Sequence, residues 1–187
     1  MEGVSADWLL SIANLEIIPD AVLGLARKGA VNFHDGPLPR YAGLNAPVWA
    51  LLNGETRHGI TWHRIAGGVD EGNILVQKTF DIAPNETALS LNTKCFAAAM
   101  ESFPDVIEAL AGDTAEGRKQ DLSERSYYGR HDRPATMGAL EFSNNTSDLL
   151  RIVHALDHGD YWNPLTCPKL DAGEAVLLIS GAAPAEG

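Results

Sequence analysis

Two polar residues two positions apart, Asn32 and His34, offer the first chemistry in the sequence. They end a short apolar run and precede a turn rich in glycine and proline. Residues two apart on a strand point to the same face, so both side chains are expected to face a pocket at the carboxyl end of a strand. An amide that donates hydrogen bonds beside an imidazole that carries protons suits acyl transfer. The spacing alone is more typical of a strand end whose polar residues cap a turn.

The elements that position this pair form a strand–helix–strand unit. A near-continuous apolar run predicts a buried strand over residues 8–18, and a helix is expected over 19–28, with proline in its first turn and glycine after its last. The strand that carries the polar pair then spans residues 30–34. Such a unit implies two parallel neighbours in one sheet. One unit is too little sheet to stand alone, so we expect the strand at 8–18 to be the middle of a sheet whose first strands are absent.

Periodicity and turn residues predict the rest of the chain. Further helices are expected over 45–53, 86–110 and 146–156, and further strands over 56–65, 73–82 and 174–181. The strands on either side of the loop 66–72 are expected to form a hairpin.

Composition divides the chain into three parts. Residues 7–112 form the expected catalytic core, and the polar segment 113–125 has no periodicity and is expected to be a linker. Residues 126–187 are expected to begin a small C-terminal subdomain.

The charge of the chain limits its partners. It has 14 Lys and Arg against 25 Asp and Glu among 187 residues, a formal net charge of −11, and no basic cluster. This composition argues against non-specific binding to nucleic acid or to an anionic membrane, both of which need a positive surface. No apolar stretch is long enough to span a membrane, and the first six residues do not resemble a signal peptide.

The two cysteines, Cys95 and Cys167, lie far apart and lack metal-ligand spacing. They are expected to be buried or idle thiols in a reducing cytoplasm. Neither a metal cluster nor a glycine-rich phosphate loop is found in the sequence, so we expect no dependence on metal or nucleotide.

Three ordered motifs resemble those of the folate-dependent formyltransferase family. They are N-F-H at 32–34, L-P-R-Y-A-G at 38–43 and T-W-H-R-I-A-G-G-V-D-E-G at 61–72. This family includes methionyl-tRNA formyltransferase, and the resemblance covers roughly residues 8–110. It implies an α/β, Rossmann-like fold with a mostly parallel sheet flanked by helices. It also implies 10-formyltetrahydrofolate as co-substrate.

The family's Asn-His-Asp catalytic set corresponds to Asn32, His34 and Asp70. In such a set Asn32 would donate a hydrogen bond to the tetrahedral oxyanion, and His34 would take the proton of the attacking amine or stabilise the oxyanion. Asp70 would orient His34 or relay a proton through water to the folate nitrogen. Outside this family frame, an aspartate in a glycine-rich loop is more typical of a turn.

The resemblance also implies binding residues. The folate-binding residues would be Leu15, Glu16, Ile17, Gly68, Val69 and Asp70. The turn after His34 would form the wall of the site, with Pro39, Arg40 and Tyr41 as candidates for binding the acceptor. Arg40 would pair there with a carboxylate or phosphate, although an exposed surface role fits it equally well.

Other histidines and tryptophans are given structural roles. His63 is expected on the core face of its strand, and His58 and His131 are expected in solvent. Trp49 and Trp62 are expected in the core.

Finer similarities point to one branch of the family. The stretch H-D-G-P-L-P-R-Y-A-G-L-N-A-P and the later Y-W-N-P-L and P-K-L are most similar to formylation domains of nonribosomal peptide synthetases. That branch implies a carrier-bound aminoacyl group, or another small amine, as acceptor, and adjoining synthetase domains as partners. Family members carry about three strands and two helices before the strand matched by 8–18, so we expect this chain to be N-terminally truncated.

Two alternatives stay open from the sequence. One is hydrolysis of 10-formyltetrahydrofolate, with water in place of the amine. The other is a degenerate folate-binding or structural module of a multidomain synthetase. Transfer RNA is disfavoured as acceptor by the net charge of −11.

Overall fold

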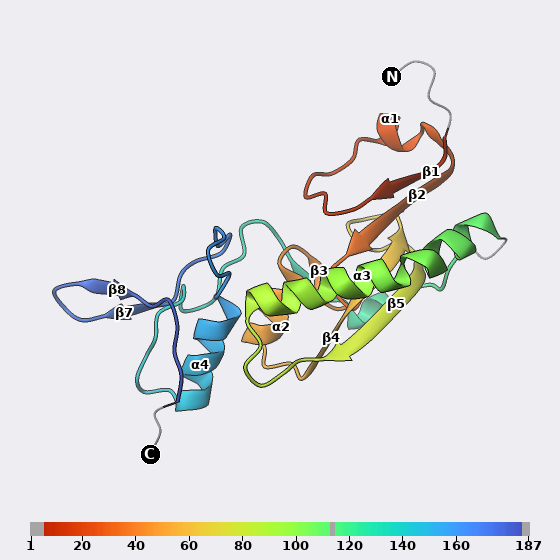
Figure 1. Cartoon of the computed structure of the whole chain (residues 1–187). Helices are drawn as coiled ribbons and strands as arrows, with labels where there is room; N and C mark the ends of the chain where they lie inside the picture. Colours follow the sequence, from red (N-terminus) through yellow and green to blue (C-terminus); the bar gives the residue numbers. More distant parts are fainter. Residues whose placement is uncertain (1–5, 113–114, 185–187) are drawn as a thin grey trace.

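A computed structural model describes residues 6–112 and 115–184, and its framework is a four-stranded sheet with the order β1-β2-β4-β5 (Figure 1). The strands are β1 (Ala6–Ser11), β2 (Ala26–His34), β4 (Arg57–Arg64) and β5 (Ile74–Asp81). β1 and β2 run parallel, whereas β2 with β4 and β4 with β5 are antiparallel. The sheet is therefore mixed, which corrects the expectation of a mostly parallel sheet.

The connection between β2 and β4 contains the short helix α2 (Ala46–Leu52). After it, β4 enters beside the end of β2 and runs back along it, with His34 opposite Thr61.

The strand–helix–strand unit is present, but its boundaries differ from those expected. The first strand ends at Ser11 rather than at residue 18, because the side chain of Asn14 bonds both the N–H and the C=O of Glu16 and turns the chain. The helix expected over 19–28 is a single turn, α1 (Asp20–Leu23). Ala26 already pairs with Ala6, so the residues that follow α1 belong to β2.

The long helix α3 (Ala88–Ala111) packs against β4 and β5 (Figure 1). Thr87 begins it with a capping box shared with Ser90, and the helix continues through Pro104. Its buried face includes Cys95 and Ser102. No helix in the described parts of the chain is long and apolar enough to cross a membrane.

The C-terminal part rests on α2 through α4 (Thr146–Ala155). Before it, η1 (Leu122–Glu124) leads to β6 (Tyr127–Tyr128), which pairs with β3 (Ala42–Gly43). After it, β7 (Lys169–Asp171) and β8 (Val176–Leu178) form a hairpin that projects from the body (Figure 1). The strand expected over 174–181 is therefore shorter, and its partner β7 was not expected.

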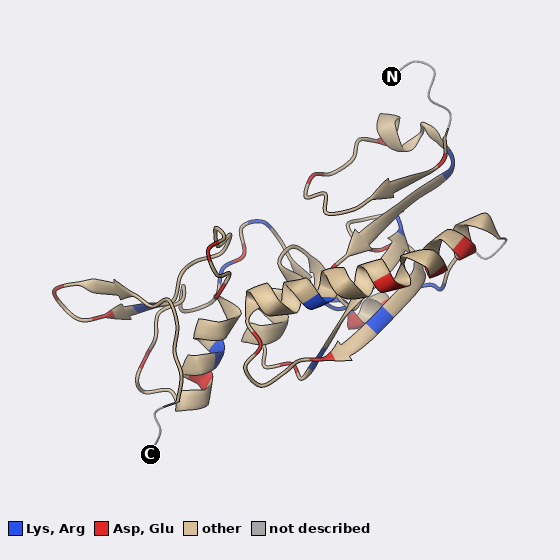
Figure 2. Ribbon diagram, viewed as in Figure 1, with Lys and Arg blue, Asp and Glu red and all other residues tan. Residues whose placement is uncertain are grey.

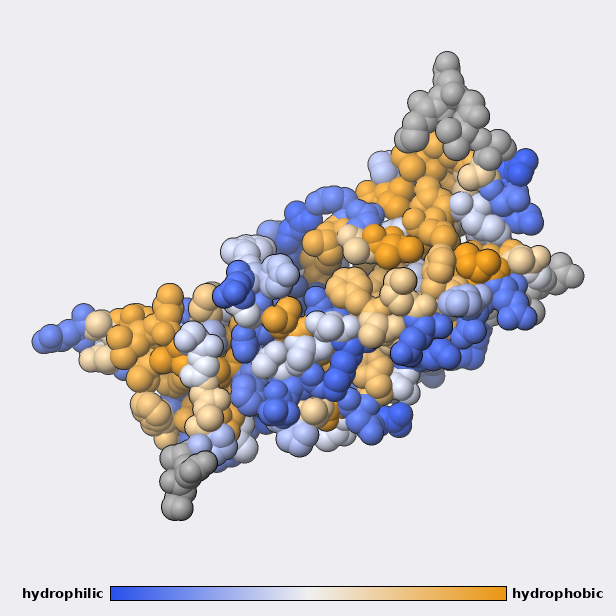
Figure 3. All heavy atoms as spheres, viewed as in Figure 1, coloured by the Kyte–Doolittle hydropathy of each residue, from blue (hydrophilic) through white to orange (hydrophobic). Residues whose placement is uncertain are grey.

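The surface agrees with the composition. Figure 2 shows lysine and arginine scattered along the ribbon among acidic positions, which outnumber them in the sequence. Figure 3 shows apolar surface over the C-terminal hairpin, where Val176 and Leu178 are exposed.

The two larger of three buried clusters in the described chain contain the tryptophans that the sequence places in the core. Trp62 and Trp49 are both buried, as expected, Trp62 under α3 and Trp49 in the cluster around α2. His58 was expected in solvent, but it is only 1% exposed. Its ring lies between the aromatic side chains of Tyr41 and Phe80, and its Nε2 donates a 2.8 Å hydrogen bond to the carbonyl of Asp35.

The hydrogen bond between Trp62 and Ser102 is a test of this packing. Ser102 Oγ accepts from Trp62 Nε1 at 3.0 Å, and both side chains are buried. Ser102→Ala leaves the indole N–H without a partner, so we expect the free energy of unfolding to fall by about 1–3 kcal/mol in urea denaturation. The exposed Ser180→Ala is the matched control. Equal stability of the two variants would contradict the packing described.

Candidate active site

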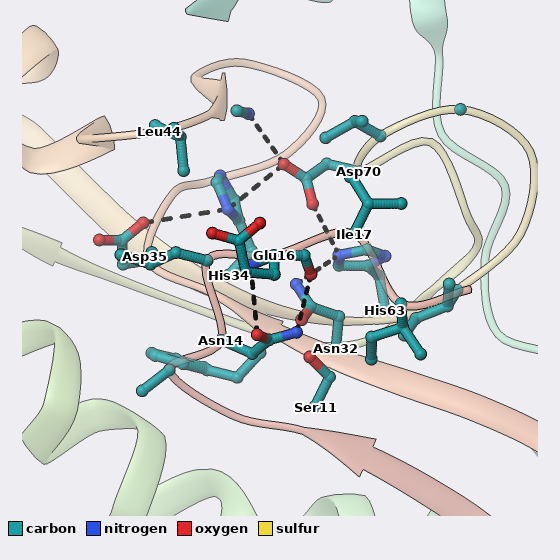
Figure 4. A pocket seen from close by; sticks show the side chains of 18 of the residues that line it. Ser11, Asn14, Glu16, Ile17, Asn32, His34, Asp35, Leu44, His63 and Asp70 are labelled. Atoms are coloured by element: carbon teal, nitrogen blue, oxygen red, sulfur yellow. Dashed lines mark hydrogen bonds and ion pairs between the residues drawn. The ribbon is translucent and has the colours of Figure 1, made fainter. Parts of the chain in front are cut away.

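A cavity of about 830 Å³ opens beside the carboxyl end of β2. Its walls come from the end of β1 and the segment after it, from β2 and β4, from the β4–β5 loop, and from residues 127 and 130 near β6. Figure 4 shows the polar side chains of β2 and of the β4–β5 loop turned toward one another at this cavity.

Asn32 and His34 both line the cavity, as their spacing on a strand predicts. His34 is buried, and its Nε2 lies 2.8 Å from the carbonyl oxygen of Tyr41. Because a carbonyl only accepts, Nε2 carries a proton and donates it in this bond. In the neutral ring Nδ1 is therefore the basic nitrogen.

Asp70, from the β4–β5 loop, contacts histidines on both β2 and β4. Its Oδ2 lies 3.5 Å from His34 Nδ1 and accepts a 2.8 Å hydrogen bond from the N–H of Gly43. Its Oδ1 lies 3.2 Å from His63 Nε2. The Asp70 side chain is 9% exposed. It contacts His34 directly and reaches Asn32 through His63, so the three residues share one polar cluster at the cavity.

The environment of Asp70 keeps its carboxylate charged. Burial by itself raises the pKa of Asp70, but the hydrogen bond with His63, the charge of His34 and the N–H of Gly43 outweigh it. The net result lowers the pKa of Asp70 to about 2. The carboxylate is thus ionised throughout the neutral range.

Asp70 adopts a left-handed backbone conformation, with φ of 58°, which its surroundings must hold. Gln120 Nε2 donates to the carbonyl oxygens of Asp70 at 2.8 Å and of Gly72 at 2.7 Å. Arg125 donates to the carbonyl of Val69 at 3.0 Å. The segment expected to be a linker therefore lies along the loop that carries Asp70 and fixes its backbone.

His63 also belongs to this cluster, although a structural role on the core face of its strand was expected for it. It lies directly opposite Asn32 in the β2–β4 ladder. Its Nδ1 donates to the carbonyl of Arg64 at 2.8 Å, and its Nε2 lies 3.3 Å from Asn32 Nδ2. The sequence feature that could have indicated this role is the position of His63 in the third motif. Only the antiparallel register of β4 on β2, however, places it beside Asn32.

The residues expected to bind folate all lie at the cavity. Leu15, Glu16 and Ile17 line one part of its wall, and Gly68 and Val69 line another together with Asp70. Leu15 and Ile17 are large apolar side chains that are 71% and 76% exposed. Within the described ranges their backbone N–H and C=O groups make no hydrogen bond to protein.

The residues expected to bind the acceptor lie elsewhere. Pro39, Arg40 and Tyr41 do not line this cavity. Arg40 pairs with Glu55, and the Tyr41 ring stacks on Tyr128 while its hydroxyl donates to Glu55 at 2.7 Å. Only the backbone carbonyl of Tyr41 reaches the site, through His34.

In the portion of the chain that the structure describes, no group of three or more His, Cys, Asp or Glu side chains is arranged to hold a metal ion.

A family model described as formyl transferase matches residues 1–107. The chain belongs to the formyl transferase family. The expected family and its α/β fold are thus confirmed, and the motifs around Asn32, His34 and Asp70 fall inside the matched region.

Solved structures of formyltransferases are similar to this chain. One is the N-formyltransferase from Helicobacter canadensis in complex with folinic acid and dTDP-3-aminofucose, with 27% identity and a TM-score of 0.63 over 71% of this chain and 49% of that one. The sugar 3N-formyl transferase WlaRD, with dTDP and 5-N-formyl-THF, has 26% identity and a TM-score of 0.68 over 78% and 52%. This chain spans about half the length of each of these two proteins.

A third similar structure is HypX from Aquifex aeolicus in complex with tetrahydrofolic acid, with 19% identity and a TM-score of 0.72 over 88% of this chain and 27% of that one. At this identity the similarity concerns the fold alone.

The contacts of Asp70 predict the pH dependence of stability. A carboxylate whose pKa is lowered from 3.8 to about 2 stabilises the fold fully above pH 4 and loses that contribution as the pH falls toward 2. The contribution is about 2 kcal/mol. We expect the difference in free energy of unfolding between the wild type and Asp70→Asn to shrink over that interval. A difference that is constant from pH 6 to pH 2 would contradict the buried contacts of Asp70.

Proposed function

We propose that this chain transfers a formyl group from 10-formyltetrahydrofolate to a primary amine. The observation that carries the proposal is the convergence of Asn32, His34 and Asp70 at the wall of one cavity. Membership of the formyl transferase family supports it. So do the folate compounds and the amino sugar nucleotide named with the similar structures.

The cavity fits a folate donor. Its volume of about 830 Å³ is within the range of sites for cofactor-sized ligands. The exposed side chains of Leu15 and Ile17 offer apolar surface for a flat ring, and their backbone groups are free to bond its polar edge. We therefore assign ring binding to residues 15–17 and to the loop at 68–70.

The reaction forms one C–N bond and breaks another. The amine nitrogen bonds to the formyl carbon, and the bond from that carbon to the folate nitrogen breaks after a tetrahedral oxyanion. The acceptor begins as an ammonium and loses two protons, of which one ends on the folate nitrogen and one goes to solvent. Charge and atoms balance without a further reactant.

Each residue of the cluster has a role in this step. Asn32 Nδ2 donates to the oxyanion, since it carries two N–H bonds and contacts only His63 Nε2, at 3.3 Å, among the described residues. His34 Nδ1 takes a proton from the amine, because Nε2 is committed to the Tyr41 carbonyl. Asp70 stabilises the protonated imidazole and keeps the ring in place.

For the acceptor we propose an aminoacyl group carried on a phosphopantetheine arm, supplied by adjoining synthetase domains in the cytoplasm. The stretch H-D-G-P-L-P-R-Y-A-G and the later Y-W-N-P-L support this choice, and the net charge of −11 argues against transfer RNA. A sugar nucleotide amine of the kind named with the relatives is the competing acceptor class.

The direct assay supplies 10-formyltetrahydrofolate with glycyl-pantetheine or β-alanyl-pantetheine thioester in one arm and dTDP-3-aminofucose in the other. We expect the N-formyl aminoacyl product by mass spectrometry. Formylation of the sugar nucleotide alone would contradict the proposed acceptor. Free formate without amine would show a hydrolase, and folate binding without turnover would show a degenerate module.

Asp70→Asn separates chemistry from binding. The variant keeps the size of the side chain but loses the charge that supports His34, so kcat for formyl transfer is expected to fall by about 10²-fold or more. The dissociation constant for folinic acid should stay within about threefold, because the apolar wall at 15–17 is intact. The control is the exposed Asp160→Asn. Near-normal turnover of Asp70→Asn would refute its role.

A further inference from the structure

A second carboxylate, Asp35, faces the cavity from the other side of His34 (Figure 4). Its Oδ1 lies 3.9 Å from His34 Nδ1, and its side chain is 32% exposed. Within the described ranges this carboxylate accepts no hydrogen bond, in contrast to Asp70. The imidazole thus lies between one carboxylate that is fully engaged and one that is open.

The backbone of Asp35 is nevertheless fixed. Its carbonyl oxygen accepts the 2.8 Å hydrogen bond from Nε2 of the buried His58, and the Sγ of Cys95 lies 3.8 Å from the same oxygen. The fold therefore holds Asp35 firmly at the cavity while its carboxylate has open acceptor positions.

The path of the amine follows from His34. An amine that gives its proton to Nδ1 must approach to about 3 Å, which places it beside both flanking carboxylates. Asp70 already accepts from Gly43 and contacts His63, so its oxygens are largely occupied. Asp35 is the carboxylate whose oxygens can still accept hydrogen bonds from a ligand.

Other charges at the cavity do not compete for this role. Arg130 is the one lysine or arginine side chain that lines it in the described chain, and it pairs with Glu16 at 3.2 Å. Asp20, on α1, adds negative charge to the wall. A positively charged acceptor nitrogen therefore meets no unpaired cation there.

We infer that Asp35 binds the acceptor amine as its ammonium form and that the site selects basic amines. This inference rests on the proposed function and specifies its acceptor. A charge-assisted hydrogen bond of this kind holds the nitrogen next to Nδ1 until His34 removes a proton. Asp35 then contributes to binding of the acceptor and leaves the folate site unaffected.

The test compares two acceptors of nearly equal shape. β-Alanyl-pantetheine thioester carries a basic amine, whereas in aminooxyacetyl-pantetheine thioester an oxygen replaces one methylene and the amine is uncharged at neutral pH. For Asp35→Asn we expect KM for the β-alanyl probe to rise at least about tenfold. KM for the aminooxy probe and for 10-formyltetrahydrofolate should change by less than about twofold.

Two further variants make the result specific. Asp35→Glu keeps the charge and should recover part of the affinity for the β-alanyl probe. Asp160→Asn removes the same charge outside the cavity and should leave both probes unchanged. Equal losses for both probes in Asp35→Asn, or no loss for either, would overturn the inference. Wild-type protein that formylates neither probe, but formylates the sugar nucleotide, would contradict the proposed acceptor. Wild-type protein that formylates neither probe nor the sugar nucleotide would refute the proposed function. Either result would overturn the role of Asp35 in binding a carrier-bound amine.

Discussion

The carboxylate of Asp70 is the contact on which the site depends. It bridges His34 on β2 and His63 on β4 and accepts the N–H of Gly43 on β3, so it joins three strands. A buried charge is costly unless each of its oxygens is bonded. The loop that carries it must therefore be held in one conformation, and Gln120 does so from a segment outside the sheet.

The two histidines share a common arrangement around this carboxylate. Each ring donates one N–H to a backbone carbonyl, His34 to Tyr41 and His63 to Arg64, and turns its other nitrogen toward Asp70. The backbone thus fixes the orientation of both rings, and the side-chain cluster is organised before any ligand enters. Such preorganisation is what stabilises a charged transition state without reorganisation during the reaction.

Parts of this arrangement could be predicted from the sequence, because they depend on local pattern. The shared face of Asn32 and His34 follows from the two-residue repeat of a strand, and the motifs indicated the family and the third member, Asp70. Other parts depend on tertiary contacts. The place of His63 beside Asn32 requires the antiparallel register of β4 on β2, which is a tertiary pairing. The burial of His58 requires Tyr41 and Phe80 around it. The early end of β1 depends on one side-chain turn at Asn14.

The function proposed for this chain requires that the cavity hold the formyl donor beside Asn32 and His34. A crystal structure of the whole chain with folinic acid, a stable formyl folate, tests it most directly. We expect a ring against Leu15 and Ile17 and a formyl group within about 4 Å of Asn32 Nδ2 or His34 Nδ1. A folate bound outside this cavity, or one whose formyl group points away from both side chains, would contradict the proposed donor site.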